Sequence, residues 1–420
     1  MLTAPDRPRP PALEPLAGMA TVRYATSLEQ VARAVEDADV LLLWDFRAQM
    51  LREAWLHARR LRWIHSSGAG VDAVLFPELV ASDVILTNSR GLFDRAIAEY
   101  VLGLMLAFAK DMWTTADAQR RREWRHRETE LLQGRRLLVI GAGGIGRAIA
   151  RLARAVGMQV EAAARTGRSD PELGRITAVA DLGGVLGGAD YVVVAAPLTP
   201  ETRGLFTAAA FERMKPTARL INIGRGAIVD EAALLEALRR KRIAGAALDV
   251  FMHEPLPKEH PFWGLPGLVV SPHMCGDFIG WAAAVADQFV ENYLRWRRGE
   301  PLLNVVDKVL GYVPSWIEAT STRDKKCRLC SPANSATNTP RAKATTACSP
   351  NSTSPASSQS VTRSTSHSIF GPKLSCPTTS LPSLVTAWRW LTQSKVVCPS
   401  SITTSSKPSV RSPSIRRSAA

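Results

Sequence analysis

The stretch GAGGIGRAIARLARAVGMQVEAAARTGRS, residues 141–169, contains the strongest indication of the fold. Its glycines form a G-x-G-x-x-G pattern, which follows the apolar run RRLLVI (135–140) and opens an amphipathic stretch at 145–156. In a strand–loop–helix unit such glycines allow a tight turn, close approach of a pyrophosphate and helix–strand packing, while the helix N-terminus attracts the phosphates. The stretch therefore predicts a dinucleotide-binding unit with cofactor contacts at Gly141, Gly143, Gly144, Ile145 and Gly146.

The end of this stretch lacks the carboxylate that usually selects NAD. An Asp or Glu about 20 residues after the glycines binds the ribose hydroxyls of NAD. This chain has Arg165, Thr166 and Arg168 in that region, and cationic and hydroxyl donors suit a 2′-phosphate. We therefore expect NADP(H) to be favoured over NAD(H). The competing interpretation is that these residues are ordinary solvated surface and that Asp170, close downstream, serves NAD(H).

Strand-like and helix-like stretches alternate through most of the chain. We expect helices at 28–38, 94–110 and 282–298, the second of them long and buried. Repeated strand–helix alternation predicts parallel sheets covered by helices on both faces. The expected strands are 22–26, 40–44, 61–67, 84–89, 135–141, 158–164, 191–197, 219–224, 244–250 and 267–273.

The distributions of charge and of cysteine along the chain distinguish an N-terminal body from a basic C-terminal tail. The net charge is +15, but residues 319–420 hold 14 Lys and Arg against one Asp and so carry +13 of it. Only Cys275 lies in the body, which therefore has no disulfide framework and fits a reducing cytoplasm. No apolar run reaches the length of a membrane helix, and the start MLTAPDRPRPP lacks a signal-peptide core. We expect a cytoplasmic protein that contacts no membrane.

The tail, residues 317–420, is rich in Ser, Thr and Pro and poor in acids, so we expect it to be disordered. Three interpretations remain open: translation in a wrong frame after a frameshift, a plain linker, and a functional tail. Binding of nucleic acid by the tail is unfavoured, because the body is nearly neutral and carries the recognisable motifs. The pair Cys327 and Cys330 has no second pair or His cluster beside it, so we expect no metal site.

Polar side chains follow the later strands of the body. Arg225 comes after the strand at 219–224, Asp249 ends the next strand, and Glu254 and His273 lie in loops beyond strand ends. Open α/β sheets bind ligands at these carboxyl ends. An Arg for a carboxylate, a His as proton donor and a Glu to orient the His suit reduction of a ketone beside a nicotinamide. Each residue alone has an ordinary structural explanation, but their combination after a nucleotide fingerprint favours catalysis.

Further motifs in the body are specific: SSGAGVD (66–72), APLTPETRGL (196–205), NIGRGAIVDEAAL (222–234), ALDVFMHEPLP (247–257) and SPHMCG (271–276). With these and GAGGIG, residues 22–314 resemble the D-isomer-specific 2-hydroxyacid dehydrogenase family. Trp44, SSGAGVD and the RTGR segment make the chain most similar to the NADP-preferring glyoxylate/hydroxypyruvate reductases. Cys275, where the family usually has a small residue, and a Pro-rich start without the usual first strand depart from the pattern.

The resemblance implies a two-domain α/β fold, with a Rossmann-type parallel-sheet cofactor domain inserted into a flavodoxin-like substrate domain. On this basis residues 1–100 and 285–316 form the substrate domain, and 101–284 form the dinucleotide-binding domain. The resemblance also implies a small 2-keto or 2-hydroxy acid as substrate. A homodimer is expected, with contacts in the region of Met105 and Trp113.

The family's residue roles carry over to matching positions. Arg225 is expected to bind the substrate carboxylate and carbonyl oxygen, His273 to protonate that oxygen, and Glu254 to hold His273. Backbone amides at Ala69 and Gly70 are expected to bind the carboxylate. Asp249 is expected to accept a hydrogen bond from the nicotinamide amide, and further cofactor contacts are expected at Pro197, Ile223, Gly224 and Gly276.

A function of another class is the alternative. Corepressors of the C-terminal binding protein type share this fold and similar site residues, yet act as dinucleotide-sensing scaffolds. The site residues therefore do not separate the two functions. Turnover of a small keto acid does, because a scaffold binds the nucleotide and a peptide partner without significant turnover.

Overall fold

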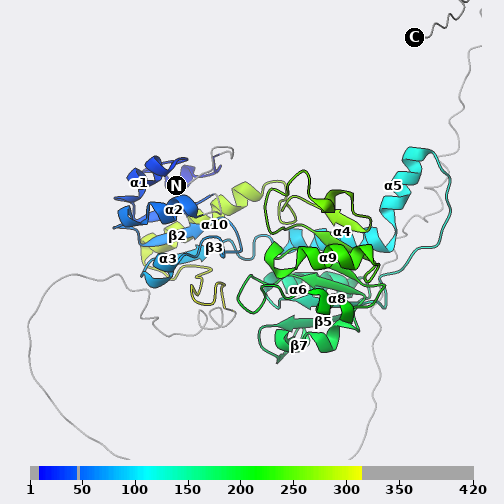
Figure 1. Ribbon diagram of the computed structural model, residues 1–420. Helices are drawn as coiled ribbons and strands as arrows, with labels where there is room; N and C mark the ends of the chain where they lie inside the picture. Colours follow the sequence, from blue (N-terminus) through cyan, green and yellow to red (C-terminus); the bar gives the residue numbers. More distant parts are fainter. Residues whose placement is uncertain (1–8, 45–47, 315–420) are drawn as a thin grey trace, which may run out of the picture. The chain divides into compact units, whose positions relative to one another are not determined.

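Two sheets organise residues 9–44 and 48–314, which are the residues that the computed structural model describes. A small sheet forms early in the chain, and a larger one is formed by residues 136–270 (Figure 1). The prediction of an α/β fold is therefore confirmed. The tail from residue 317, with its expected disorder and the Cys327–Cys330 pair, lies outside the described residues.

The small sheet is parallel throughout, in the order β1–β2–β3. Its central strand has a neighbouring strand on each side and is buried at every position, because side chains such as Trp63 and Ile64 pack into apolar clusters on the two faces of the sheet. The side chain of Ser27 caps the first helix by accepting a hydrogen bond from the Gln30 amide. The elements around this sheet are α1 (Leu28–Val35), β1 (Val40–Leu43), α2 (Gln49–Glu53), β2 (Trp63–Ser66), α3 (Pro77–Ala81) and β3 (Ile85–Asn88), with short 3₁₀ helices η1 (Glu14–Leu16) and η2 (Trp55–His57).

The predicted strand at 22–26 is wrong. Only Ala25 forms an isolated bridge there, and Val22 is 37 % exposed. A strand needs a neighbouring edge to satisfy its backbone, whereas the hydrogen-bonded order of the small sheet begins at β1. Arg23 forms an exposed ion pair with Asp37, just after α1. The stretch is therefore a loop segment from which Ala25, 2 % exposed, packs into the core around the small sheet.

The larger sheet has the order β11-β10-β9-β8-β4-β5-β7-β6, and every pair in it is parallel except β6–β7. All strands expected between residues 135 and 273 are present. The sequence pattern missed β6 and β7, because β6 is a short, polar edge strand whose first two residues are exposed. The strands are β4 (Arg136–Ile140), β5 (Gln159–Ala164), β6 (Arg168–Asp170), β7 (Gly174–Ala178), β8 (Tyr191–Val194), β9 (Arg219–Asn222), β10 (Gly245–Leu248) and β11 (Leu268–Val270).

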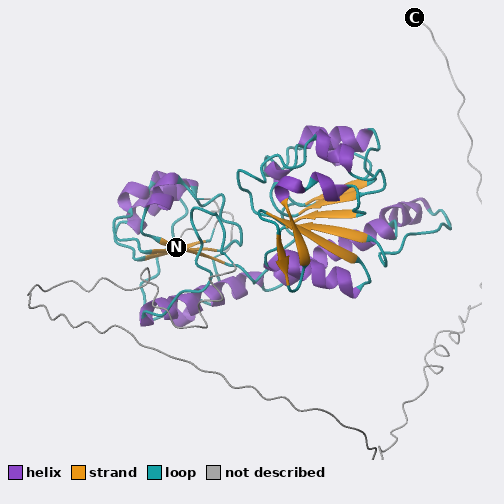
Figure 2. Cartoon of the chain, turned by 90° about the horizontal axis from the view of Figure 1, so that it is seen from below, coloured by secondary structure: helices purple, strands orange, loops and turns teal. Residues whose placement is uncertain are grey.

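Helices cover both faces of the larger sheet (Figure 2). The helices that follow β3 along the chain are α4 (Asp94–Ala109), α5 (Met112–Arg121), α6 (Gly144–Ala155), α7 (Gly183–Leu186), α8 (Ala208–Arg213), α9 (Glu231–Arg239) and α10 (Trp281–Arg298), with short 3₁₀ helices η3 (Val179–Asp181), η4 (Gly226–Ile228) and η5 (Pro261–Gly264). Of these, α10 lies beside the small sheet (Figure 1). Among these described helices, none combines the length and apolar character needed to cross a membrane.

The chain returns to the small sheet after the larger one is complete. Phe289 of α10 stacks on Trp63 of β2, with ring centroids 5.4 Å apart. Beyond α10, the ammonium group of Lys308 donates to the carbonyl oxygens of Leu79 and Val84 at 3.0 Å. Residues from both ends of the described chain therefore build the part around the small sheet. The predicted domain limits at 100/101 and 284/285 fall inside the continuous helices α4 and α10 and stay a prediction.

Candidate active site

The glycine-rich loop lies where the strand order of the larger sheet reverses, between β4 and its neighbours β5 and β8. Gly141 has a φ of 115°, and a Cβ there would overlap the Ala195 carbonyl that follows β8. A Cβ at Gly146 would overlap the Gly141 carbonyl oxygen, so only glycine allows α6 to pack this closely on the loop. Gly143 faces open space, as access for a phosphate requires. The loop therefore has the three properties that a dinucleotide cradle needs.

The loop after β5 is exposed and basic. Arg165, Thr166 and Arg168 are all exposed, and Arg168 Nη1 donates to the Thr166 carbonyl oxygen at 3.3 Å. The guanidinium carbon of Arg165 lies 5.8 Å from the centroid of the Tyr312 ring. A hydrogen bond with Thr199 and, more weakly, the charge of Arg165 lower the pKa of Glu201, which places this carboxylate near the same loop. The structure thus brings these sequence-predicted residues together at one end of the sheet.

Asp170 is the acid that, in the alternative interpretation of the sequence, would serve NAD(H). In the structure its carboxylate bonds other residues of the protein. It is 8 % exposed, and its Oδ1 accepts a hydrogen bond from Nη1 of Arg147 at 2.9 Å. The backbone amides of Glu172 and Leu173 also donate to Oδ1, at 3.0 and 2.9 Å. The ion pair with Arg147, together with these amides, outweighs burial and holds the pKa of Asp170 far below its usual range. This carboxylate is a structural anion that ties β6 to α6.

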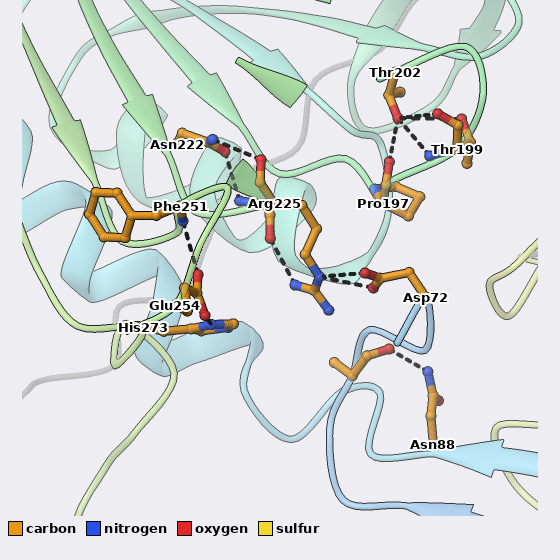
Figure 3. A network of polar contacts seen from close by, with 12 residues as sticks. Asp72, Asn88, Pro197, Thr199, Thr202, Asn222, Arg225, Phe251, Glu254 and His273 are labelled. Carbon is orange, nitrogen blue, oxygen red and sulfur yellow. Dashed lines mark hydrogen bonds and ion pairs between the residues drawn. The ribbon is translucent and has the colours of Figure 1, made fainter. Parts of the chain in front are cut away.

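Arg225 follows β9 and is held by a carboxylate that the sequence analysis did not single out. Its Nε donates to both oxygens of Asp72, at 2.9 and 3.1 Å, and its Nη1 donates to the Gly224 carbonyl oxygen at 2.8 Å (Figure 3). Asn222 fixes the backbone of the same loop, because its side chain bonds both the Gly224 amide and the Arg225 carbonyl oxygen. Asp72 is the last residue of the SSGAGVD motif (66–72). This acidic residue at the end of the motif was the sequence signal that could have identified it.

Gly70 lies against the Arg225 guanidinium. A Cβ at Gly70 would overlap Nη2 of Arg225, so the absence of a side chain is what permits this approach. Asn88, at the end of β3, donates its amide to the Ala69 carbonyl oxygen and so fixes the neighbouring peptide. The structure therefore brings together Ala69, Gly70 and Arg225, which sequence analysis assigned to one carboxylate.

Glu254 and His273 form a direct pair. Nδ1 of His273 lies 2.8 Å from Oε2 of Glu254, and the Phe251 amide donates to Oε1 at 2.9 Å (Figure 3). Burial raises the pKa of Glu254, but the bonds with His273 and Phe251 and the charge of Arg225 outweigh it, and the pKa is lowered. An ionised carboxylate on Nδ1 leaves Nε2 as the nitrogen for a reacting group. About one third of each side chain, 36 % for His273 and 35 % for Glu254, is accessible to solvent.

The remaining predicted residues sit on adjoining loops. Ile223 is 7 % exposed beside Gly224, and Pro197 is exposed at the end of β8, where its carbonyl oxygen accepts from the Thr202 hydroxyl at 2.7 Å. Asp249 is only 1 % exposed, and its carboxylate bonds the turn that carries His273. A Cβ at Gly276 would approach the Phe93 ring to 3.3 Å. Their roles toward a cofactor stay predictions.

The predicted dimer contact needs one correction. Met105 is 1 % exposed, because it lies on the side of α4 that packs into the core, so it is no surface contact. Its neighbours on and after the same helix are accessible, with Leu106 39 %, Met112 53 % and Trp113 38 % exposed. Among the described residues, no group of three or more His, Cys, Asp or Glu is placed to hold a metal ion.

Residues 102–275 match the family model described as D-isomer specific 2-hydroxyacid dehydrogenase, NAD binding domain. Glyoxylate/hydroxypyruvate reductase A of Serratia proteamaculans is 32 % identical over 281 residues, which cover 66 % of this chain and 88 % of that protein. A D-isomer specific 2-hydroxyacid dehydrogenase of Xanthobacter autotrophicus, solved with NADPH and MES, is 36 % identical with a TM-score of 0.58, covering 66 % and 86 % of the two chains.

The NADPH-dependent glyoxylate/hydroxypyruvate reductase of Sinorhizobium meliloti, solved with NADP and sulfate, is 31 % identical. Its TM-score is 0.62, and the match covers 71 % of this chain and 94 % of that one. The glycine-rich loop, the paired His and Glu, and these similarities lead to one conclusion. The chain belongs to the D-isomer specific 2-hydroxyacid dehydrogenase family and is an oxidoreductase with an NAD(P)-binding domain.

Proposed function

We propose that this protein reduces a small 2-keto acid of the glyoxylate or hydroxypyruvate type to the D-2-hydroxy acid, with NADPH as the reductant. The observation that carries the proposal is the His273–Glu254 pair, 2.8 Å apart and within the electrostatic influence of Arg225. A proton donor and a fixed cation are the two groups that a 2-keto acid needs beside a hydride source. The names of the similar reductases from Serratia and Sinorhizobium support this substrate class.

The residues present fit a dinucleotide. Side chains at Gly141 and Gly146 would fill the cradle or push α6 away, while Gly143 leaves room for a phosphate. The amides at the start of α6 would hold the diphosphate, and Pro197, Ile223 and Gly224 would line the nicotinamide end. Bound NADPH supplies the hydride for the carbonyl carbon. The chain's own residues bind and orient the keto acid and deliver the proton.

The proposed preference for NADPH rests on the residues that follow β5 and on the carboxylate in β6. Arg165, Thr166 and Arg168 offer cationic and hydroxyl donors in an exposed loop. Asp170 does not oppose a 2′-phosphate there, because its carboxylate is buried against Arg147. The nicotinamide cofactors of the Xanthobacter and Sinorhizobium structures, NADPH and NADP, also favour a phosphorylated cofactor.

Exchanging the cofactor-selecting residues tests this preference. In the double variant Ala164→Asp, Arg165→Ser, a carboxylate at the end of β5 replaces the cation, so NADPH should lose its advantage and NADH should gain. One charge-assisted hydrogen bond is worth about 1.5–3 kcal/mol, so kcat/KM for NADPH relative to NADH should fall by roughly ten- to a hundredfold, mainly through KM. Steady-state kinetics with both cofactors measure it. A wild-type enzyme that already prefers NADH would contradict the proposal.

The proposed chemistry assigns a task to each contact. The Arg225 guanidinium, held by Asp72, binds the substrate carboxylate and polarises the carbonyl oxygen, with the amides of Ala69 and Gly70 beside it. His273 gives its Nε2 proton to the carbonyl oxygen, which becomes the hydroxyl of the product. Glu254 stays ionised and holds the ring through Nδ1. Because Glu254 occupies Nδ1, Nε2 is the nitrogen left to face the carbonyl oxygen.

Replacing Glu254 with glutamine should move the pH dependence of reduction. The lowered pKa of Glu254 means that the wild-type carboxylate is charged across the neutral range. A neutral amide stabilises the imidazolium less, so proton donation should be lost at a lower pH and the alkaline limb of the kcat profile should shift downward. Measuring kcat from about pH 5 to 9 tests the pairing. An alkaline limb at the wild-type position would show that Glu254 does not act through His273.

We also propose a homodimer formed through α5 and the segment after it. Trp124 and Leu131 are exposed in that segment, and Met112 and Trp113 of α5 are accessible as well. A hollow of about 890 Å³ lined by residues such as Phe108, Trp113 and Trp263 adjoins them. Several exposed apolar side chains along one segment are typical of an interface. Sedimentation velocity on the full chain should give a dimer, and a monomer at micromolar concentration would contradict the proposal.

A further inference from the structure

One side of α6 carries three arginines that all bond the turn between β6 and β7. Arg147, Arg151 and Arg154 are spaced by four and three residues, so they lie on the same side of the helix. Nη1 of Arg147 donates to Oε2 of Glu172 at 3.0 Å, and Nη1 of Arg151 donates to Oε1 of the same carboxylate at 2.8 Å. Nη1 of Arg154 donates to the Glu172 carbonyl oxygen at 2.9 Å. The turn that follows β6 is therefore attached to α6 at three points.

Asp170, the last residue of β6, adds a buried attachment. Its carboxylate pairs with the Arg147 guanidinium, and its Oδ1 also accepts the amides of Glu172 and Leu173. A carboxylate that bonds amides shortly after its own residue stabilises a turn, and here this is the turn from β6 to β7. Because the pair is partly shielded from water, its charges attract each other more strongly than on an open surface. The pair therefore fixes both the turn and the position of β6 against α6.

Arg168, the first residue of β6, stands on the face of the sheet that α6 covers. Ala150 of α6 shares a small apolar cluster with Ala162 of β5 and Ile176 of β7. Ile176 is the register partner of Arg168, and residues directly opposite each other in paired strands point to the same face. Asp170 points to this face as well, because side chains alternate along a strand. Since the N-terminus of α6 would hold the diphosphate, Arg168 lies on the side of the sheet where the cofactor would bind.

The strand that carries Arg168 has little support from the sheet itself. β6 has three residues, the first two of them exposed, and β7 is its neighbour in the hydrogen-bonded order of the described sheet. A strand this short, paired along one edge, gains little stability from its backbone hydrogen bonds alone. The bonds from α6 to Asp170 and Glu172 are therefore what holds the start of β6 and the loop before it in place.

We propose that the Asp170–Arg147 pair is a positioning pair for cofactor selection, which holds Arg168 and the loop after β5 where they bind the 2′-phosphate of NADPH. The inference deepens the proposed function, since it rests on the preference for NADPH. It assigns to Asp170 an effect opposite to that of its charge. A direct effect of a carboxylate would repel a 2′-phosphate, whereas positioning by the carboxylate strengthens the binding of that group.

The test compares two nucleotides that differ only in the 2′-phosphate, adenosine 2′,5′-bisphosphate and adenosine 5′-monophosphate. Titration calorimetry on the full chain measures both Kd values and needs no turnover. Asp170→Asn removes the negative charge and turns an NH₂ group toward Arg147, so the attachment of β6 is weakened. The Kd for the bisphosphate should rise about fivefold or more, a part of the roughly ten- to a hundredfold that one charge-assisted bond provides. The Kd for the monophosphate should stay within about twofold of the wild-type value.

Glu172→Gln is the second variant. It removes a negative charge from the same turn and weakens the bonds with Arg147 and Arg151, while Asp170 keeps its place. The Kd for the bisphosphate should rise in the same direction, by about two- to threefold, because several attachments of the turn remain. A direct charge effect predicts the opposite sign in both variants, namely tighter binding of the bisphosphate.

Asp190→Asn is the matched control. Asp190 is also a partly buried carboxylate of the larger sheet, bonded to the Arg136 amide at 2.8 Å and to Lys215 at 2.7 Å. It lies just before β8, at the opposite end of the parallel strands from the loop after β5. The same chemical change there should lower the melting temperature and leave both Kd values unchanged.

An unchanged or lower Kd for the bisphosphate in Asp170→Asn would overturn the inference, and so would a parallel rise of both Kd values. Glu172→Gln decides the matter by the same criteria if Asp170→Asn does not fold. A wild-type chain that binds the two nucleotides equally would contradict the preference for NADPH and the inference with it. A chain that shows the expected changes but reduces no keto acid would keep the inference and reject the proposed reduction.

Discussion

Replacing His273 with alanine should lower kcat for keto-acid reduction by about a hundredfold or more, the usual contribution of a positioned general acid. The Kd for NADPH should change little, because the imidazole pairs with Glu254 and is not part of the glycine-rich loop that would hold the diphosphate. No other described histidine pairs with Glu254 in the structure, so the lost proton donor has no replacement on that carboxylate. Single-turnover and steady-state rates at saturating NADPH measure the loss.

His57→Ala is the matched control for this experiment. His57 is exposed in η2, a short helix beside the small sheet, and belongs to none of the site contacts. The control should keep both kcat and the melting temperature. Near-normal turnover in His273→Ala, with a folded protein, would remove His273 from the mechanism and leave the pair with Glu254 as a structural contact.

Replacing Arg225 with glutamine should lower kcat/KM for the keto acid by roughly ten- to a hundredfold, mainly through a higher KM, because a charge-assisted contact to the carboxylate is lost. A second effect adds to this one. Asp72 would lose its cation and remain as a negative charge near the place where the anionic substrate binds. The KM for NADPH should be little changed, since the residues that hold the diphosphate lie on the glycine-rich loop.

Two further variants help to interpret the result for Arg225→Gln. Asp72→Asn keeps the guanidinium and weakens only its fixation, so it should raise the KM for the keto acid in the same direction with a smaller effect. Arg240→Gln removes an exposed arginine that pairs with Glu236 on α9 and should leave the kinetics unchanged. A KM for the keto acid that stays at the wild-type value in Arg225→Gln would contradict the assignment of the carboxylate to Arg225.

The fold could be predicted from the sequence wherever a strand is buried and a loop needs glycine. The strands from β4 to β11 are recognisable in the sequence as apolar runs, except for β6 and β7. β6 is the edge strand, where water can replace a packing partner, so it carries no apolar run. β7 lies between β5 and β6, and only one of its five residues is buried. The opposite error occurred at 22–26, where a short apolar pattern forms only an isolated bridge at Ala25.

The site residues were predictable singly, through motifs, but their mutual contacts were not. Asp72 and Arg225 are separated by 153 positions, and only the folded chain shows that one holds the other. Asp249 is predicted as a cofactor contact at a strand end, but the sequence does not show that the neighbouring turn folds onto its carboxylate, which is 1 % exposed. Met105 looked like a surface contact because an apolar helix does not reveal which of its sides meets the core. Burial and long-range contacts depend on the whole fold, and residue patterns do not encode them locally.

The most direct test of the central claim is the oxidation of NADPH by the purified full chain in the presence of a panel of keto acids. Glyoxylate, hydroxypyruvate, pyruvate and phenylpyruvate would be compared, each with NADPH and NADH in parallel. Turnover of glyoxylate or hydroxypyruvate, with a higher kcat/KM for NADPH than for NADH, is the result that the site predicts. Tight binding of NADPH with no turnover of any keto acid would contradict it and favour the dinucleotide-sensing scaffold.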